Sequence, residues 1–171
     1  MQLLNLLNKY RMNASKLIQE LNLQPHPEGG YYKETYRGEP RIKLDNGKER
    51  NSSTAIYYML TNEDKSHFHK VLSDEIWLFH QGETIIIYEI DQHGELVTHL
   101  LGINFSKGES PQIVIPKGNW FAAQIESKTG FSLVSCIVAP GFEFEDFILA
   151  NKQELLSQYS KYHDIISEMS L

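Results

Sequence analysis

Short runs that alternate apolar and polar residues recur along most of the chain, and clusters of Gly, Pro, Asn and Asp separate them. A period of two indicates β-strands, because successive side chains of a strand point to opposite faces. Turn signals at intervals of about ten residues are typical of an antiparallel sandwich or barrel, not of alternating strands and helices. We therefore predict strands over residues 31–37, 54–60, 67–71, 75–80, 84–90, 95–101, 112–115, 120–125 and 131–139.

Helical patterns occupy both ends of the chain. The leucines within 3–9 fall on one side of a short helix, and Asn13 is a suitable N-cap for a second helix. Near the other end, a helix is expected after the N-cap Asn151, and a further helical piece over 163–169. Residues 23–30 contain two rigid prolines and two permissive glycines. We interpret them as an ordered loop before the first strand, with a pocket rim as the alternative.

Two further segments have distinctive patterns. Residues 38–53 are polar and contain an Asp-Asn-Gly turn signal, which favours a loop or a hairpin tip. Residues 142–147, Phe-Glu-Phe-Glu-Asp-Phe, alternate aromatic and acidic side chains, as a strand would. We expect the rings to pack against a sheet or a dimer partner and the acidic side chains to face solvent: Phe142, Phe144 and Phe147 on one side, Glu143, Glu145 and Asp146 on the other.

The composition adds limits on the class of protein. With 171 residues, 41% of them hydrophobic, the chain is expected to form one globular domain over 1–171. No run of Lys and Arg stands out, and the net charge of −6 disfavours nucleic acid or an anionic membrane as a partner. The single Cys136 lies in an apolar run and can form no internal disulfide, so we expect a buried, inert thiol.

The leucine-rich start of the chain invites comparison with a signal peptide. It lacks a basic region, polar residues interrupt its apolar run, and no small-residue cleavage site follows. No later segment is apolar over the length that a membrane span requires. We therefore expect a soluble protein of the cytoplasm.

The densest group of chemically capable side chains lies within residues 66–82. On a regular strand His67 and His69 share a face, and Glu75, Trp77 and Phe79 share a face of the next strand by the same rule. A turn near residues 73–74 would fold the second strand beside the first. The prediction is that two imidazoles and a carboxylate meet in one cavity.

The spacing of this group resembles a known motif. The first cupin motif has two histidines separated by one residue, then a glutamate after five intervening residues and a glycine after six more. His67, His69, Glu75 and Gly82 match this spacing. The second cupin motif has Pro-x-Gly followed by a histidine three residues after the glycine. Pro116-Lys117-Gly118 supplies the turn, but position 121 is Phe. The chain therefore resembles a cupin that lacks one of the usual metal ligands.

Longer blocks narrow the resemblance to the Cupin_5 family, also catalogued as DUF985. The blocks that carry it lie at residues 26–35, 53–60, 66–77, 114–123 and 138–147. The resemblance covers about residues 13–159, which leaves 1–12 and 160–171 as helical or frayed extensions. It implies an all-β jelly-roll barrel with a central pocket and short terminal helices, and usually a homodimer. It implies no particular reaction.

Two departures from the family pattern concern the pocket. Relatives commonly carry Gln where this chain has Phe121, so a polar group is replaced by a ring that can neither ligate a metal nor form a hydrogen bond. Of the two histidines, His69 fits the family pattern better than His67.

Two interpretations of the His–Glu group stay open at this stage. Two neutral imidazoles and a carboxylate, here His67, His69 and Glu75, suit a divalent transition metal such as Fe, Mn, Zn or Ni. Such a metal would support an oxygenase, a hydrolase or a Lewis-acid isomerase. Without metal, Glu75 beside the apolar Trp77 and Phe79 would have a raised pKa and could act as a general acid or base.

The sequence-based functional hypothesis is an epimerase-like or isomerase-like enzyme that acts on a sugar or nucleotide-sugar type metabolite. His69 and Glu75 are the predicted catalytic residues. Predicted ligand-binding residues are His67, Tyr58, Trp77, Phe79 and Phe121, although such rings are also typical of a barrel core. The alternatives are a non-catalytic metabolite-binding module and a metal-dependent oxygenase or hydrolase. The expected partners are a small-molecule ligand and a second copy of the chain.

Overall fold

The computed structural model describes residues 13–171 apart from 45, 63 and 128–129, so the helix expected over 3–9 lies outside the described residues. Within the described part, one antiparallel sheet has the strand order β1 (Gln24–Pro25), β2 (Tyr31–Arg37), β5 (Thr54–Thr61), β12 (Phe131–Ala139), β7 (Asp74–Gly82) and β10 (Gln112–Ile115). A second sheet has the order β13 (Phe147–Leu149), β6 (Ser66–Val71), β11 (Trp120–Ile125), β8 (Ile85–Ile90) and β9 (Leu96–Leu101). These antiparallel sheets confirm the predicted all-β class.

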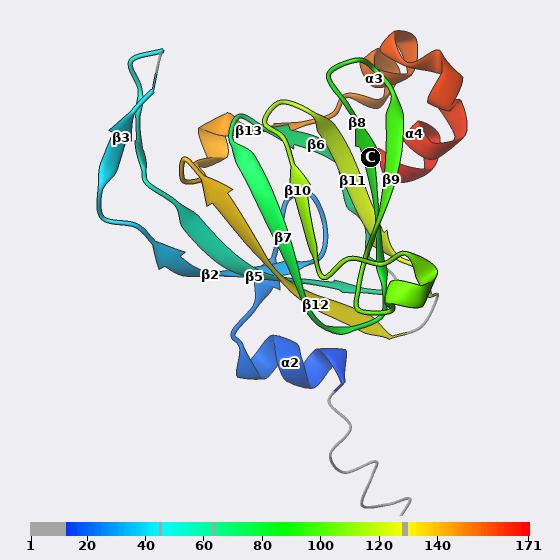
Figure 1. The fold of residues 1–171 in the computed structure, drawn as a ribbon, viewed down its shortest axis with the longest axis horizontal. Coiled ribbons are helices and arrows are strands. Elements are labelled where there is room, and N and C mark those ends of the chain that lie inside the picture. Colours follow the sequence, from blue (N-terminus) through cyan, green and yellow to red (C-terminus); the bar gives the residue numbers. More distant parts are fainter. Residues whose placement is uncertain (1–12, 45, 63, 128–129) are drawn as a thin grey trace, which may run out of the picture.

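The remaining elements surround the two sheets (Figure 1). A hairpin of β3 (Arg41–Lys43) and β4 (Glu49–Asn51) projects from one end of the molecule, which confirms the expectation for 38–53. Near the chain ends lie α2 (Ala14–Glu20), α3 (Lys152–Gln158) and α4 (His163–Met169). Short 3-10 helices cover η1 (Phe105–Lys107), η2 (Phe144–Asp146) and η3 (Ser160–Tyr162). Among the described residues, no helix combines the length and apolar character that a membrane span requires.

The apolar alternation along each strand separates the core into layers. In β5, Tyr58 and Leu60 face the space between the sheets, whereas Met59 between them packs with Leu17 of α2. In β11, Phe121 likewise faces the central cluster, whereas Ala122 packs with residues of α3 and α4. The helices therefore cover outer sheet faces that would otherwise expose apolar side chains to water.

The predicted helix starts are confirmed. The Asn13 side chain accepts a hydrogen bond of 2.8 Å from the backbone N–H of Lys16. The Asn151 side chain accepts one of 3.1 Å from the backbone N–H of Glu154. Each asparagine thus satisfies an amide that the first turn of a helix leaves without an internal partner.

The strand expected over 142–147 is wrong. Residues Phe144–Asp146 form a 3-10 helix, and strand pairing begins only at Phe147. The expected sides are reversed at two positions, because Asp146 is buried at 3% exposure whereas Phe144 is 53% exposed; Glu145 faces solvent as expected. The cause is Arg50, whose buried guanidinium binds Asp146 through two hydrogen bonds and thereby draws this carboxylate inward.

Candidate functional site

A cavity of about 260 Å³ opens at one end of the six-stranded sheet. Its buried end is lined by Glu28, Tyr58, His69, Glu75 and Cys136, which come from four strands and one loop. Its exposed end is lined by Lys33, Glu34 and Arg37 of β2 and by Phe142, Glu143 and Phe144. Polar and ionisable side chains thus gather where a ligand would lose most of its contact with water.

The carboxylate of Glu28 is the centre of the buried hydrogen-bond network. The hydroxyl of Ser66 donates to Oε1 over 2.9 Å. At the other oxygen, Oε2 lies 3.2 Å from Nε2 of His69 and 3.3 Å from Nδ1 of His26. Two neighbouring imidazoles and a hydroxyl therefore surround a carboxylate that is only 6% exposed.

The loop that carries Glu28 is held close to β6 by a tight turn. The Gly29 amide donates to the His26 carbonyl, and the His26 amide donates to the Gly30 carbonyl, each over 3.0 Å. Gly29 has a φ of +113°, and a Cβ at this position would lie 2.0 Å from the carbonyl oxygen of Lys65. Only glycine fits this backbone conformation and approach, so the turn places Glu28 against Ser66 and His69.

The hydrogen bonds around His69 define its protonation. Nδ1 of His69 lies 2.8 Å from the carbonyl oxygen of His67, and this oxygen can only accept, so Nδ1 carries a proton. Nε2 of His69 then faces Oε2 of Glu28 across 3.2 Å, where an added proton would form a hydrogen bond between the two groups. Burial lowers the pKa of His69, and the Glu28 carboxylate opposes this shift. The pair can therefore take up a proton at the contact between Nε2 and Oε2 and release it again.

Two carboxyl groups in this cavity have opposite pKa shifts. Burial raises the pKa of Glu28, but the charge of His69 and hydrogen bonds from His26 and Ser66 outweigh it, so the pKa is about 2. Burial and the charge of Glu28 raise the pKa of Glu75 to about 8, against smaller effects of Cys136 and Trp77. At neutral pH Glu28 is therefore ionised, whereas Glu75 keeps its proton.

Two further groups at the buried end stay neutral. Burial, and next the charge of Glu28, raise the pKa of the Tyr58 phenol well above its usual value. Its hydroxyl donates to the carbonyl oxygen of Gly29 over 2.8 Å, which fixes the ring beside the loop. Burial also raises the pKa of the Cys136 thiol, and the charge of Glu75 adds to this. Cys136 is buried as predicted, and its side chain lines the cavity.

The structure brings together only some of the residues that the sequence singled out. Tyr58, His69 and Glu75 line the cavity. Trp77 and Phe121 are fully buried in the central core behind it, and Phe79 packs against the same core. These rings support the lining residues: the ring centroids of Trp77 and Tyr58 lie 5.5 Å apart, and those of Phe121 and His69 lie 4.1 Å apart.

His67 does not join His69 in the cavity. The register between β6 and β11 shifts, because His69 pairs with Phe121 whereas Ser66, three residues earlier, pairs with Ala123. This irregularity breaks the period of two. Ser66 and His69 consequently both reach Glu28, whereas Nδ1 of His67 lies 2.7 Å from the Glu28 carbonyl oxygen.

The predicted metal ligands do not fit a divalent transition metal. Within the part of the chain that the structure describes, no group of three His, Cys, Asp or Glu side chains is arranged to hold an ion. His67 is bound to the loop carbonyl, and Nε2 of His69 faces the Glu28 carboxylate. Phe121 occupies the neighbouring position with an apolar ring. The expected set of His67, His69 and Glu75 is therefore not a ligand set in this structure.

Sequence reasoning missed Glu28 and His26, which line the cavity. The preferred interpretation of residues 23–30, an ordered loop before the first strand, was therefore incomplete, and the pocket-rim alternative describes the segment better. The signal in the sequence was a glutamate between Pro27 and Gly29, where a rigid backbone holds a charged side chain.

The comparisons with known proteins agree with the fold. The family model described as "Cupin superfamily (DUF985)" matches residues 15–150. The uncharacterized protein YML079W of Saccharomyces cerevisiae is 34% identical over 151 residues, which cover 78% of this chain and 73% of that protein. Among solved structures, a hypothetical protein from Leishmania major is 33% identical, with a TM-score of 0.87 over 93% of this chain and 99% of the other.

Two further structural relatives extend the comparison. Protein SO0799 from Shewanella oneidensis is 39% identical, with a TM-score of 0.87 over 94% of this chain and 98% of the other. An oxalate decarboxylase of Bacillus subtilis is 15% identical, with a TM-score of 0.53 over 85% of this chain and 36% of the other, which shows a shared fold alone. The resemblance noted in the sequence is thereby confirmed: this chain belongs to the Cupin_5 (DUF985) family of the cupin superfamily.

Proposed function

We propose that the cavity binds a small metabolite of the sugar or nucleotide-sugar type and catalyses an epimerisation or isomerisation by proton transfer. The observation that carries this proposal is the opposite protonation of two carboxyl groups in one buried cavity. Glu75 holds its proton at neutral pH, whereas Glu28 is ionised and its carboxylate lies 3.2 Å from Nε2 of His69. An acid and a base with separated pKa values are what reversible proton transfer requires.

The two groups reach the cavity from different walls. Glu75 comes from β7 of the six-stranded sheet, whereas His69 comes from β6 of the other sheet and Glu28 from the loop before β2. In the proposed reaction, the Glu28–His69 pair takes a proton from a carbon next to a carbonyl group. The electrons of that C–H bond move to the carbonyl oxygen, and Glu75 gives its proton to this oxygen. The pair then returns a proton to carbon while an enediol hydroxyl gives its proton back to the Glu75 carboxylate, so that a carbonyl re-forms and both groups regain their starting protonation.

The cavity walls suit a ring-shaped ligand of modest size. Tyr32, Phe142 and Phe144 line the outer part, and aromatic faces stack on sugar rings and planar bases. The buried Tyr58 hydroxyl is engaged with the loop carbonyl, so Glu75 and the Glu28–His69 pair are the groups proposed for chemistry.

Solvent deuterium exchange tests the proposal, because it can be followed for many candidate substrates in the same way. We would incubate the protein in D₂O with a panel of ketoses, aldoses and nucleotide sugars and follow the loss of C–H signals by proton NMR. Exchange is expected with the wild type, and a loss of about a hundredfold or more with Glu75→Gln and His69→Ala. His99→Ala is the matched control, because His99 lies 2.7 Å from a buried glutamate, Glu89, that does not line the cavity.

Two results would contradict the proposal. Exchange that survives in both cavity variants would exclude His69 and Glu75 as the proton-transfer groups. A ligand that raises the melting temperature without any exchange would favour the alternative, a non-catalytic metabolite-binding module.

A further inference from the structure

Part of the outer cavity wall comes from a short segment, residues 142–146, between β12 and β13, of which residues 142–144 line the cavity. Phe142 and Phe144 line the cavity, and their ring centroids lie 5.1 Å apart in an edge-to-face arrangement. The Phe144 ring also lies nearly parallel to that of His26, at a centroid distance of 6.0 Å and an angle of 26°. Phe144 is 53% exposed, so its ring presents an aromatic surface to solvent at the mouth of the cavity.

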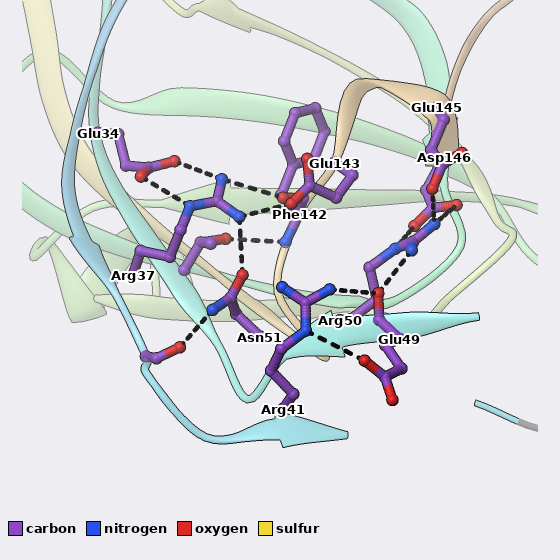
Figure 2. Close-up of polar contacts among 12 residues, drawn as sticks. Glu34, Arg37, Arg41, Glu49, Arg50, Asn51, Phe142, Glu143, Glu145 and Asp146 are labelled. Atoms are coloured by element: carbon purple, nitrogen blue, oxygen red, sulfur yellow. Dashed lines mark hydrogen bonds and ion pairs between the residues drawn. The ribbon is translucent and has the colours of Figure 1, made fainter. Parts of the chain in front are cut away.

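Arg37 of β2 holds the beginning of this segment (Figure 2). Its guanidinium donates to both carboxylate oxygens of Glu34, over 3.0 and 2.8 Å. It also donates to Asn51 over 3.2 Å, to the Glu143 carboxylate over 2.7 Å and to the carbonyl oxygen of Phe142 over 3.3 Å. These contacts engage all the N–H groups that an arginine has. Arg37 lines the cavity, but it has no N–H left for an anionic ligand.

Arg50 of β4 holds the end of the same segment (Figure 2). It binds Asp146 through two hydrogen bonds, of 2.6 and 2.9 Å, and it also contacts the Glu145 carboxylate. A further N–H donates to the carbonyl oxygen of Glu49 over 2.8 Å. Arg50 and Asp146 are both buried, and burial strengthens a charge-assisted pair of this geometry.

We propose that Arg37 and Arg50 are positioning residues that hold residues 142–146 as a binding wall, and that Phe144 on this wall stacks on the ring of the ligand. This inference rests on the proposed ligand-binding function of the same cavity. The two arginines bind the segment on either side of Phe144, so the ring is held between two fixed points. Neither arginine contacts the Glu28–His69 pair or Glu75 through a hydrogen bond or ion pair among the described residues.

Hydrogen exchange measured by mass spectrometry tests the positioning role without a ligand. Arg37→Lys and Arg50→Lys keep the charge but lose the fork that binds several acceptors at once. We expect amide exchange across 142–147 to become about tenfold faster in either variant, because these contacts oppose local opening. Arg41→Lys is the matched control, since the polar contacts of this exposed arginine, in the same hairpin as Arg50, are with Glu49 among the residues that the structure describes.

If Arg50→Lys does not fold, Arg37→Lys alone decides, because the Arg37 side chain is about one-third exposed and its replacement disturbs the core less. Exchange across 142–147 that stays within about twofold of the wild type in Arg37→Lys would overturn the positioning role.

Ligand stacking is tested with indole as a planar probe, by saturation-transfer NMR. We expect the wild type to bind indole, and Phe144→Ala and Arg37→Lys to bind it about fivefold more weakly. No binding to the wild type, or equal binding to Phe144→Ala, would overturn the stacking role. Neither measurement involves Glu75 or the Glu28–His69 pair, so a failure of the proposed proton transfer would be seen separately.

Discussion

The raised pKa of Glu75 predicts an unusual dependence of stability on pH. In the folded protein this carboxyl has a pKa of about 8, against an ordinary value of 4.5. Between these values the folded state binds a proton that the unfolded state has released, so the free energy of unfolding falls as pH rises. The free energy of unfolding falls by about 1.4 kcal/mol per pH unit. Relative to pH 4.5, the loss is about 3 kcal/mol at pH 7 and about 5 kcal/mol over the whole window.

Glu75→Gln removes this effect, because the amide cannot ionise in either state. We therefore expect the variant to be more stable than the wild type at pH 8, and the difference to shrink toward zero near pH 4.5. Urea unfolding at a series of pH values, followed by tryptophan fluorescence to which the buried Trp77 contributes, measures both proteins under the same conditions.

Glu109→Gln is the matched control for this experiment. Glu109 is also buried, but its pKa is lowered, chiefly by a hydrogen bond from the Asn104 amide, so its replacement should destabilise the protein. A difference between wild type and Glu75→Gln that stays constant from pH 5 to pH 8 would refute the assigned protonation of Glu75, and with it the proposed general acid.

Three other predictions concern the same region and the assembly. Glu28→Gln should lose about 3 kcal/mol of stability at pH 7, and this loss should disappear as the wild type is acidified from about pH 4.5 to pH 2, as urea unfolding would show. Gly29→Ala should destabilise the protein by more than about 2 kcal/mol through its clash with the Lys65 carbonyl, measured in the same way. From the family resemblance we expect a homodimer, and a monomer mass in light scattering would contradict it.

Much of the local structure could be predicted because it depends on local rules. The period of two located the strands, including Thr54–Thr61 and Phe131–Ala139, since each strand presents one face to a packed layer. The N-caps Asn13 and Asn151 could be identified because a capping side chain bonds an amide three residues away. The blocks of family residues then indicated the jelly-roll fold.

The candidate site could be predicted only in part. Tyr58, His69 and Glu75 reach the cavity from strands that the pattern located. His67 does not, because the pairing of β6 with β11 shifts register between Phe121 and Ala123. This shift is visible only once the two strands are paired. Glu28 was missed because its partners, Ser66 and His69, are about forty residues away along the chain.

The sequence by itself therefore determined most of the strands and helices, which family the chain belongs to, and which cluster of ionisable residues to examine. The tertiary structure alone decided how these residues are used. Arg50 binds the buried Asp146 at a sequence separation of 96 residues, and Nε2 of His69, which was expected to face a metal, faces the Glu28 carboxylate. Protonation and facing direction follow from contacts between distant segments, and no local period contains that information.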